Sequence, residues 1–333
     1  MSTVSVTIDG IILNCDDSIL SVNIGNGYTM KKVYLSEFPY KDRIMDARNN
    51  LNIEYINSQK EDENGKYFFC LCKEDTYEIT SPEFRPGTVI NDADIMCNDQ
   101  LAIYTDQASD YLYSCFSLLH VFKKGNIALK NIFLKHLHTT LGFTNTQIHV
   151  INNVSYNISD TRIFTLSANE IVDMNQFILD FMGAPLSLMK GCIDEFVWGL
   201  AQIDIPTAFE QYTTAMEMIL LETNQQGKKE CLSKRTALLL AQNDIDVQNI
   251  YAQMKLFYRY RSESLHEGDG GNITAQELHD MEDVVRKVLK HYLILCKNEL
   301  QHNPSITWNE IKANEITRLK SAVQAKISSG VLS

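Results

Sequence analysis

The pattern of hydrophobic and polar positions changes along the chain from the two-residue period of strands to the longer period of helices. Between residues 1 and 104, short apolar or alternating segments are separated by Gly, Asn and Asp, which is typical of a β-rich region. Strands are expected at residues 4–8, 19–24, 28–35, 51–56, 67–72 and 77–79. Turns are expected at residues 9–10 and 25–27, and the polar residues 58–65 are expected to form a hairpin tip.

The middle of the chain is expected to connect this region to a helical one. Apolar stripes at helical spacing within residues 107–141 predict two helices, broken at Lys124-Gly125-Asn126. The second stripe consists of Leu129, Ile132, Phe133 and Leu137. Residues 147–166 are expected to form strands or a linking arm.

From residue 167 onward the apolar positions recur with a helical period. Helices are expected at 168–182, 187–203, 207–224, 228–242, 246–266 and 274–298, with an amphipathic tail helix from Thr307. Residues 243–246 are a capping stretch before the fifth helix, and Thr274 and Glu277 form a capping box before the sixth. The sequence therefore predicts an α+β protein in three parts: a β-rich N-terminal domain at 1–104, a helical hairpin and strand linker at 105–166, and an α-helical domain at 167–333.

The helix expected at 246–266 carries an arginine on its buried stripe. The stripe consists of Ile250, Met254, Phe257, Arg261 and Leu265. A guanidinium in such a position is costly unless an anion meets it. The breaker residues 267–272 end the helix, so His266 is expected in its last turn, where the helix dipole favours an imidazolium. An arginine and a histidine in these positions suit chemistry on a phosphate group.

The spacing of this pair is not specific by itself. Five helical residues leave Arg261 and His266 about 140° apart, so they converge only if the helix ends at His266 or if two copies of the helix face each other. Arg286 and His291 repeat the spacing. The first match differs because an aromatic run precedes it, Ser262 follows the arginine, and a glycine-rich segment follows the histidine.

Residues 261–268, Arg-Ser-Glu-Ser-Leu-His-Glu-Gly, resemble the R-x4–6-H signature of HEPN (higher eukaryotes and prokaryotes nucleotide-binding) domains, and are closest to the ApeA-like branch. The similarity covers about residues 205–298, and residues 118–127 resemble an upstream segment more weakly. The usual His-Gly is here His266-Glu267-Gly268, which places a negative charge beside the imidazole. No tyrosine stands two residues after the histidine, which argues against the variant that a partner nucleotidyltransferase modifies.

The resemblance implies a metal-independent endoribonuclease that requires no cofactor. RNA supplies its own 2′-hydroxyl nucleophile, so His266 would move protons and Arg261 would stabilise the phosphorane. It also implies a composite cleft in which the two protomers of a homodimer each contribute one such pair.

Other residues are expected to support this site. Glu217 and Glu210, seven residues apart on one helix face, either orient Arg261 or form an ordinary salt bridge with it. Ser262 either contacts phosphate and the histidine or only packs, and Glu267 adjoins the histidine. The residues expected to bind RNA are Lys255, Tyr258 and Arg259; packing is the alternative for Tyr258.

Composition limits these expectations. A formal net charge of −12 disfavours a general nucleic-acid binder, but residues 228–297 hold 11 Lys or Arg and 10 Asp or Glu, with basic clusters such as Lys228-Lys229. Such clusters are also typical of solvated helix faces. Of the 8 cysteines, only Cys70 and Cys72 are close in sequence, and they share one strand face. No second pair lies at the spacing of a zinc site, so we expect reduced thiols and no metal site. No signal segment or long apolar stretch is present, which predicts a cytoplasmic protein with no membrane partner.

Three functions are compatible with these features. The first is a ribonuclease effector of a toxin or anti-phage defence system, whose N-terminal domain senses a phage-derived or partner-protein trigger. The second is a non-catalytic HEPN-type module for dimerisation or nucleotide binding, which Glu267 favours. The third is a sensor or adaptor whose activity resides in a partner protein.

Overall fold

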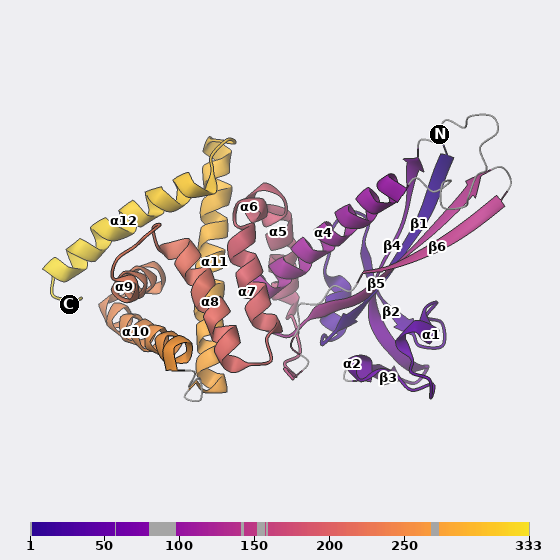
Figure 1. The fold of residues 1–333 in the computed structure, drawn as a ribbon, viewed down its shortest axis with the longest axis horizontal. Coiled ribbons are helices and arrows are strands. Elements are labelled where there is room, and N and C mark those ends of the chain that lie inside the picture. The colour runs from indigo at the N-terminus through magenta and orange to yellow at the C-terminus, as the bar shows by residue number, and fades with distance from the viewer. Residues whose placement is uncertain are drawn as a thin grey trace. The chain divides into compact units, whose positions relative to one another are not determined.

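The computed structural model describes residues 2–56, 58–79, 98–140, 143–151, 157, 159–267 and 273–332. The chain is α+β, with an antiparallel sheet followed by a helical region, which confirms the predicted fold class (Figure 1). It divides into two compact units. The first contains Met1–Leu119, Gly125–Val154 and Asp160–Leu179, and the second contains His120–Lys124, Ser155–Ser159 and Asp180–Ser333.

The first unit is built on a six-stranded sheet in the order β2-β4-β1-β5-β6, with β3 paired to β4. The strands are β1 (Ser2–Leu13), β2 (Thr29–Tyr34), β3 (Lys60–Asp62), β4 (Gly65–Ile79), β5 (Ala128–Thr140) and β6 (Phe143–Ile151). The short helices are η1 (Asp17–Ser21), α1 (Lys41–Ile44) and α2 (Ile53–Ile56), and the longer ones are α4 (Asn98–Phe122) and α5 (Ala168–Phe181).

Helix α4 covers one face of this sheet (Figure 1). Tyr104 of α4 stacks on Tyr77 of β4 with 4.7 Å between ring centroids, and its hydroxyl donates to Asp75 at 2.9 Å. The buried strand positions on that face, such as Val6 and Ile8, are almost wholly shielded from solvent. Burial of this apolar surface is the main stabilising contribution of the sheet.

The second helix expected within residues 107–141 is wrong, because residues 128–140 form strand β5. The register between β1 and β5 pairs Ile11 with Lys130 and Gly10 with Ile132, so Asn131 is an extra, bulged residue with φ of 49°. The extra residue places Leu129 and Ile132, three residues apart, on one face of the sheet, while Phe133 and Leu137 lie on the other. The four residues therefore have helical spacing in the sequence without sharing one face. The turn expected at Asp9-Gly10 is also wrong, since β1 continues through it.

Two further strand predictions in this unit are wrong. Residues 19–24 do not pair in the sheet; they overlap helix η1, whose N-cap Asp16 accepts a hydrogen bond from the Ser18 amide. Residues 51–56 contain helix α2 instead of a strand. Both segments have apolar residues but are too short for periodicity to distinguish a helical turn from a strand.

The second unit is helical, as predicted. Its helices are α6 (Ala184–Leu188), α7 (Lys190–Ala201), α8 (Ile205–Leu220), α9 (Lys228–Leu240), α10 (Asp244–Glu267), α11 (Ala275–His302) and α12 (Trp308–Ser328). Both predicted capping motifs are confirmed: Asn243 accepts from the Asp246 amide at 2.9 Å, and Thr274 and Glu277 form a capping box. In the described part of the chain, no helix combines the length and apolar character needed to cross a membrane.

Helix α12 is attached to α11 by one buried carboxylate. Glu315 accepts hydrogen bonds from Arg318 at 2.7 and 2.6 Å, and its Oε1 lies 3.2 Å from Nε2 of His291. Burial opposes ionisation, but the bonds from Arg318 and His291 prevail and lower the pKa of Glu315 to about 2. The ionised carboxylate therefore stabilises the folded state.

We expect Gly125→Ala to destabilise the protein by about 2–4 kcal/mol. Gly125 has a φ of +144°, and an added Cβ would lie 2.8 Å from the backbone Cα of Phe164. Gly65→Ala is the matched control, because Gly65 also has a positive φ of +118° but no atom within 4 Å of the added Cβ; it should cost about 1–2 kcal/mol. Equal losses in urea unfolding would contradict the steric explanation.

We expect Glu315→Gln to lower stability at neutral pH and to lose this effect in acid. The folded-state pKa of Glu315 lies below its ordinary value of 4.5, so the contribution is fully present above that value and disappears as the pH falls towards 2. Urea titrations at neutral pH and at about pH 3 would measure the change. Glu299→Gln on α11 is the control, since Glu299 enters no ion pair among the described residues; an equal pH dependence in both variants would disprove the assignment.

Candidate functional site

The apolar stripe predicted for α10 faces the core. Met254 and Phe257 are buried, and the Phe257 ring meets Phe209 of α8 edge to face, 5.5 Å away. Arg261 follows one turn later on the same line, and its side chain is 20% exposed. The stripe therefore brings the guanidinium to the border between core and solvent, alongside α8.

Arg261 is held by a carboxylate from α8. Its Nη1 lies 3.2 Å from Oε1 of Glu217 and donates to the Tyr258 hydroxyl at 3.4 Å. The Tyr258 hydroxyl donates in turn to the same Glu217 oxygen at 3.2 Å. On the other oxygen, Glu217 receives Lys228, the first residue of α9, at 3.1 Å. Two cations thus share one carboxylate, and these groups carry a net charge of +1.

Burial determines the protonation state of Tyr258 and leaves one hydrogen-bond donor of Arg261 without a partner among the described residues. Burial and the adjacent Glu217 carboxylate raise the pKa of Tyr258, so the phenol stays protonated and acts as a donor. Nε of Arg261 is buried and has no hydrogen-bond partner among the described residues. The guanidinium is therefore only partly satisfied by the protein groups around it.

Of the two glutamates expected near Arg261, Glu217 forms the ion pair. Among the described residues no ion pair joins Glu210 to the arginine, although it lies on the same helix two turns earlier. Ser262 is exposed beside the arginine. His266 and Glu267 occupy the last turn of α10, as expected for the backbone, but their side chains lie outside the described residues, as does that of Leu265.

The three residues expected to bind RNA differ in their surroundings. Lys255 pairs with Glu230 of α9 at 2.9 Å, and the hydrogen bond to Glu230 raises the pKa of the lysine. Tyr258 is half-buried in the cluster around Glu217. Arg259 is exposed, with its guanidinium carbon 5.8 Å from the Tyr260 ring centroid. Arg259 is thus the most accessible of the three cationic or aromatic side chains.

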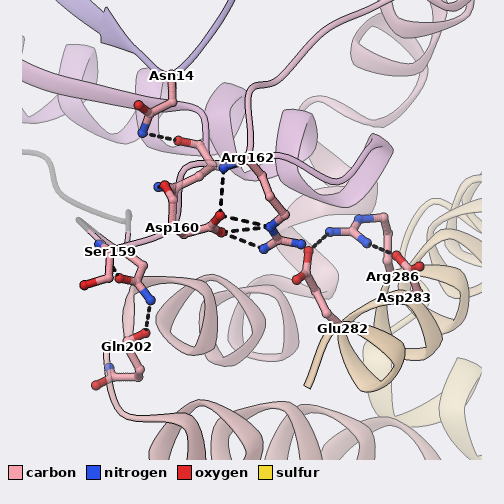
Figure 2. Close-up of polar contacts among 10 residues, drawn as sticks. Asn14, Ser159, Asp160, Arg162, Gln202, Glu282, Asp283 and Arg286 are labelled. Carbon is pink, nitrogen blue, oxygen red and sulfur yellow. Dashed lines mark hydrogen bonds and ion pairs between the residues drawn. The ribbon is translucent and has the colours of Figure 1, made fainter. Parts of the chain in front are cut away.

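In the other Arg-x4-His match, Arg286 and His291 contact different carboxylates and not each other. Arg286 is buried and donates from Nε to the His120 carbonyl at 2.9 Å. Figure 2 shows its contacts with the carboxylates of Glu282 and Asp283. His291 faces Glu315, as described above. Arg286 therefore contacts two carboxylates, whereas Arg261 contacts one, which it shares with Lys228.

Lys228 was not identified as a site residue from the sequence. Its position in the cluster Lys228-Lys229 is visible, but nothing in the spacing connects it with Glu217, eleven residues earlier. The connection arises because the segment after α8 returns the chain so that α9 begins beside the end of α8. Tyr260 makes a comparable unforeseen contact: its hydroxyl donates at 2.6 Å to Glu277, the capping-box residue of α11.

Within the described residues, no cluster of three or more His, Cys, Asp or Glu side chains is arranged to hold a metal ion. The described cysteines are free thiols, and all but Cys231 are buried. Comparisons of the chain with protein-family models, with curated proteins and with solved structures found no match.

We expect Glu217→Gln to destabilise the protein by about 1–2 kcal/mol, because two cations lose their shared counter-charge in a half-buried setting. Glu210→Gln is the matched control on the same helix and should change stability by less than about 0.5 kcal/mol. Urea unfolding of the two variants measures the difference. If both variants lose the same stability, the ion pair with Arg261 does not contribute as described.

Proposed function

We propose that this protein is a metal-independent endoribonuclease, in which Arg261 and His266 act on a phosphodiester of RNA. The observation that carries the proposal is the state of Arg261: a partly exposed guanidinium in a cluster with a net charge of +1. Such a cluster attracts a phosphate, which would complete the charge balance that Glu217 leaves unfinished. His266, in the last turn of the same helix, supplies a group that titrates near neutral pH.

The proposed reaction is attack by the RNA 2′-hydroxyl on the adjacent phosphorus. The imidazole of His266 would take the hydroxyl proton or return one to the leaving 5′-oxygen. The guanidinium of Arg261 would stabilise the charge that accumulates on the phosphorane oxygens. Arg259, exposed on the same helix, would contact the RNA backbone.

A homodimer would complete this site. Arg261 and His266 point in directions about 140° apart on a regular helix, so one helix does not aim both at one phosphate. Two copies of α10 facing each other across a twofold axis would let the arginine of one protomer work with the histidine of its partner.

In the cell, we propose that the protein acts in the cytoplasm as the effector of a toxin or anti-phage defence system. The sheet-containing unit would then receive the trigger, which is a phage-derived molecule or a partner protein, and the helical unit would cut RNA.

The Glu217–Arg261 pair also favours a second candidate, a non-catalytic module. A half-buried arginine paired with a glutamate is what a purely structural contact requires, and Glu267 places a further carboxylate next to His266 in the sequence. In this alternative the helical unit serves dimerisation or nucleotide binding, and the protein acts as a sensor or adaptor for a partner.

We expect expression of the wild-type protein to arrest growth and the purified protein to cut RNA in the presence of EDTA. Arg261→Ala and His266→Ala should each reduce cleavage by at least about a hundredfold, because each removes a group that acts in the transition state. Cleavage is measured on labelled RNA by gel electrophoresis. Equal cleavage by all three proteins, or cleavage that EDTA abolishes, rejects the proposed ribonuclease.

Two control variants separate catalysis from folding. Arg261→Lys keeps the positive charge near Glu217 but loses the planar fork, so it should fold normally and cut poorly. His291→Ala removes the histidine of the second Arg-x4-His match and should leave cleavage unchanged. If neither RNA cleavage nor growth arrest occurs but the protein sediments as a dimer, the non-catalytic module is the better description.

A further inference from the structure

The sheet face opposite α4 carries a buried carboxylate at its centre. In the strand register, Asp9 of β1 lies between Cys72 of β4 and Phe133 of β5, so these three side chains share one face. Tyr77 of β4, which stacks on α4, has the opposite parity and lies on the other face. A central strand position bounded by an aromatic ring and a thiol is an apolar setting for an acid.

Asp9 is only 9% exposed, and within the described residues its carboxylate enters no ion pair. Its side-chain hydrogen-bond partner is the Cys72 thiol, which is a weak donor. Burial raises the pKa of Asp9 above its ordinary range. An acid in this position costs stability, because removal of a carboxylate from water is poorly compensated by one thiol.

The carboxylate borders a cavity of about 320 Å³ on this face. The side chains that define its chemistry are Thr7, Asp9, Thr29, Lys31, Cys72 and Glu74. They come from three adjacent strands, since Thr7 pairs with Glu74 and Cys72 pairs with Thr29. The volume is at the small end of ligand sites and suits a molecule or a single side chain with few heavy atoms.

The charges around the cavity are unevenly distributed. Asp9 and Glu74 provide two carboxylates. Lys73 also borders the cavity, but its ammonium pairs with Asp75 at 2.7 Å. Lys31 is exposed on the edge strand β2 and makes no ion pair among the described residues, but its charge acts on Asp9 and opposes the rise of that carboxyl's pKa. The threonine hydroxyls add acceptors beside Asp9 and Glu74, which make no ion pair among the described residues, so this part of the lining suits a positively charged group with N–H donors.

We propose that this cavity is a binding site for a small organic cation, a primary ammonium or guanidinium group, with Asp9 as its counter-charge. The cation would form with Asp9 the ion pair that Lys31 does not form, and it would donate to Thr7, Thr29 and Glu74. The group belongs either to a free amine or to one Lys or Arg side chain of another protein. This site is independent of the proposed ribonuclease, since it lies in the other unit of the chain and requires no RNA.

Titration calorimetry of the full-length protein with two probes tests whether the site binds a cation. It also tells whether that cation comes from a free small molecule or from a protein side chain. Agmatine presents the guanidinium as a free small molecule, and a blocked Gly-Arg-Gly peptide presents it as a side chain. Binding of agmatine alone identifies a free amine, and binding of the peptide alone, or of both, identifies a pocket that admits a protein side chain. Binding of neither probe overturns the proposal, whatever the outcome of the RNA assays.

Asp9→Asn is the decisive variant, because it removes the charge with almost no change of shape. We expect it to weaken probe binding by at least about tenfold while the melting temperature stays the same or rises, as a burial cost is removed. Unchanged probe affinity in a folded Asp9→Asn protein overturns the assignment. If Asp9→Asn loses both stability and probe binding, the result for Lys31→Glu decides: the proposal is overturned when Lys31→Glu does not bind the probe more tightly than the wild type does.

That next variant, Lys31→Glu, keeps the test valid if Asp9→Asn does not fold. Lys31 is exposed, so its replacement should leave the fold intact. The change from a positive to a negative charge at the rim should tighten probe binding by about three- to tenfold at low salt. Glu61→Gln, at an exposed position of β3 away from the cavity lining, is the control and should bind as wild type does. Weaker or unchanged binding by Lys31→Glu overturns the proposal.

Discussion

The carboxylate of Glu217 joins three helices, and the position of Arg261 depends on it. It comes from the last turn of α8, receives Lys228 from the first residue of α9, and receives Arg261 and Tyr258 from α10. Each of these groups is only partly shielded, so the contact is stronger than a surface ion pair but avoids the full desolvation cost of a buried one. One negative charge for two positive charges fixes the position of Arg261 without neutralising its surroundings.

The helices were largely predictable, and the strands were less so, for a physical reason. In α10 and α11, the apolar positions keep a helical period over many turns, and the capping groups at Asn243 and Thr274 mark where the helices begin. In β5 the bulge at Asn131 interrupts the two-residue period, so Leu129 and Ile132, three residues apart, share one face of the sheet, while Phe133 and Leu137 lie on the other. Gly10 follows Asp9 in what is a common turn signal, but it lies at that bulge, where an added Cβ would come within 2.7 Å of the Leu129 side chain. Long-range pairing, which no local pattern encodes, decided both cases.

The same limit applies to the candidate site. The stripe of α10 predicted that Arg261 would lie at the edge of the core, because helical periodicity fixes direction relative to Met254 and Phe257. It did not identify the counter-charge, since Glu210 and Glu217 share one face of α8 and only the crossing of α8 and α10 selects between them. Lys228 was beyond prediction for a similar reason, since its approach depends on the course of the chain between α8 and α9. The burial of Asp9 in a central strand was not predictable either, because Asp followed by Gly is a common turn signal.

Arg286 provides an internal standard for what a structural charge looks like in this protein. Its guanidinium is buried, and it contacts two carboxylates and a backbone carbonyl. Arg261 and Asp9 differ from it in the same respect: each is a charged side chain withdrawn from water with less compensation than it needs. A fold selected only for stability would replace such groups or complete their pairing, since each incomplete pair reduces a small net stability. In the two proposals made above, the missing partner arrives from outside the chain: a phosphate at Arg261, which reaches the protein surface, and a cation at Asp9, which borders a cavity.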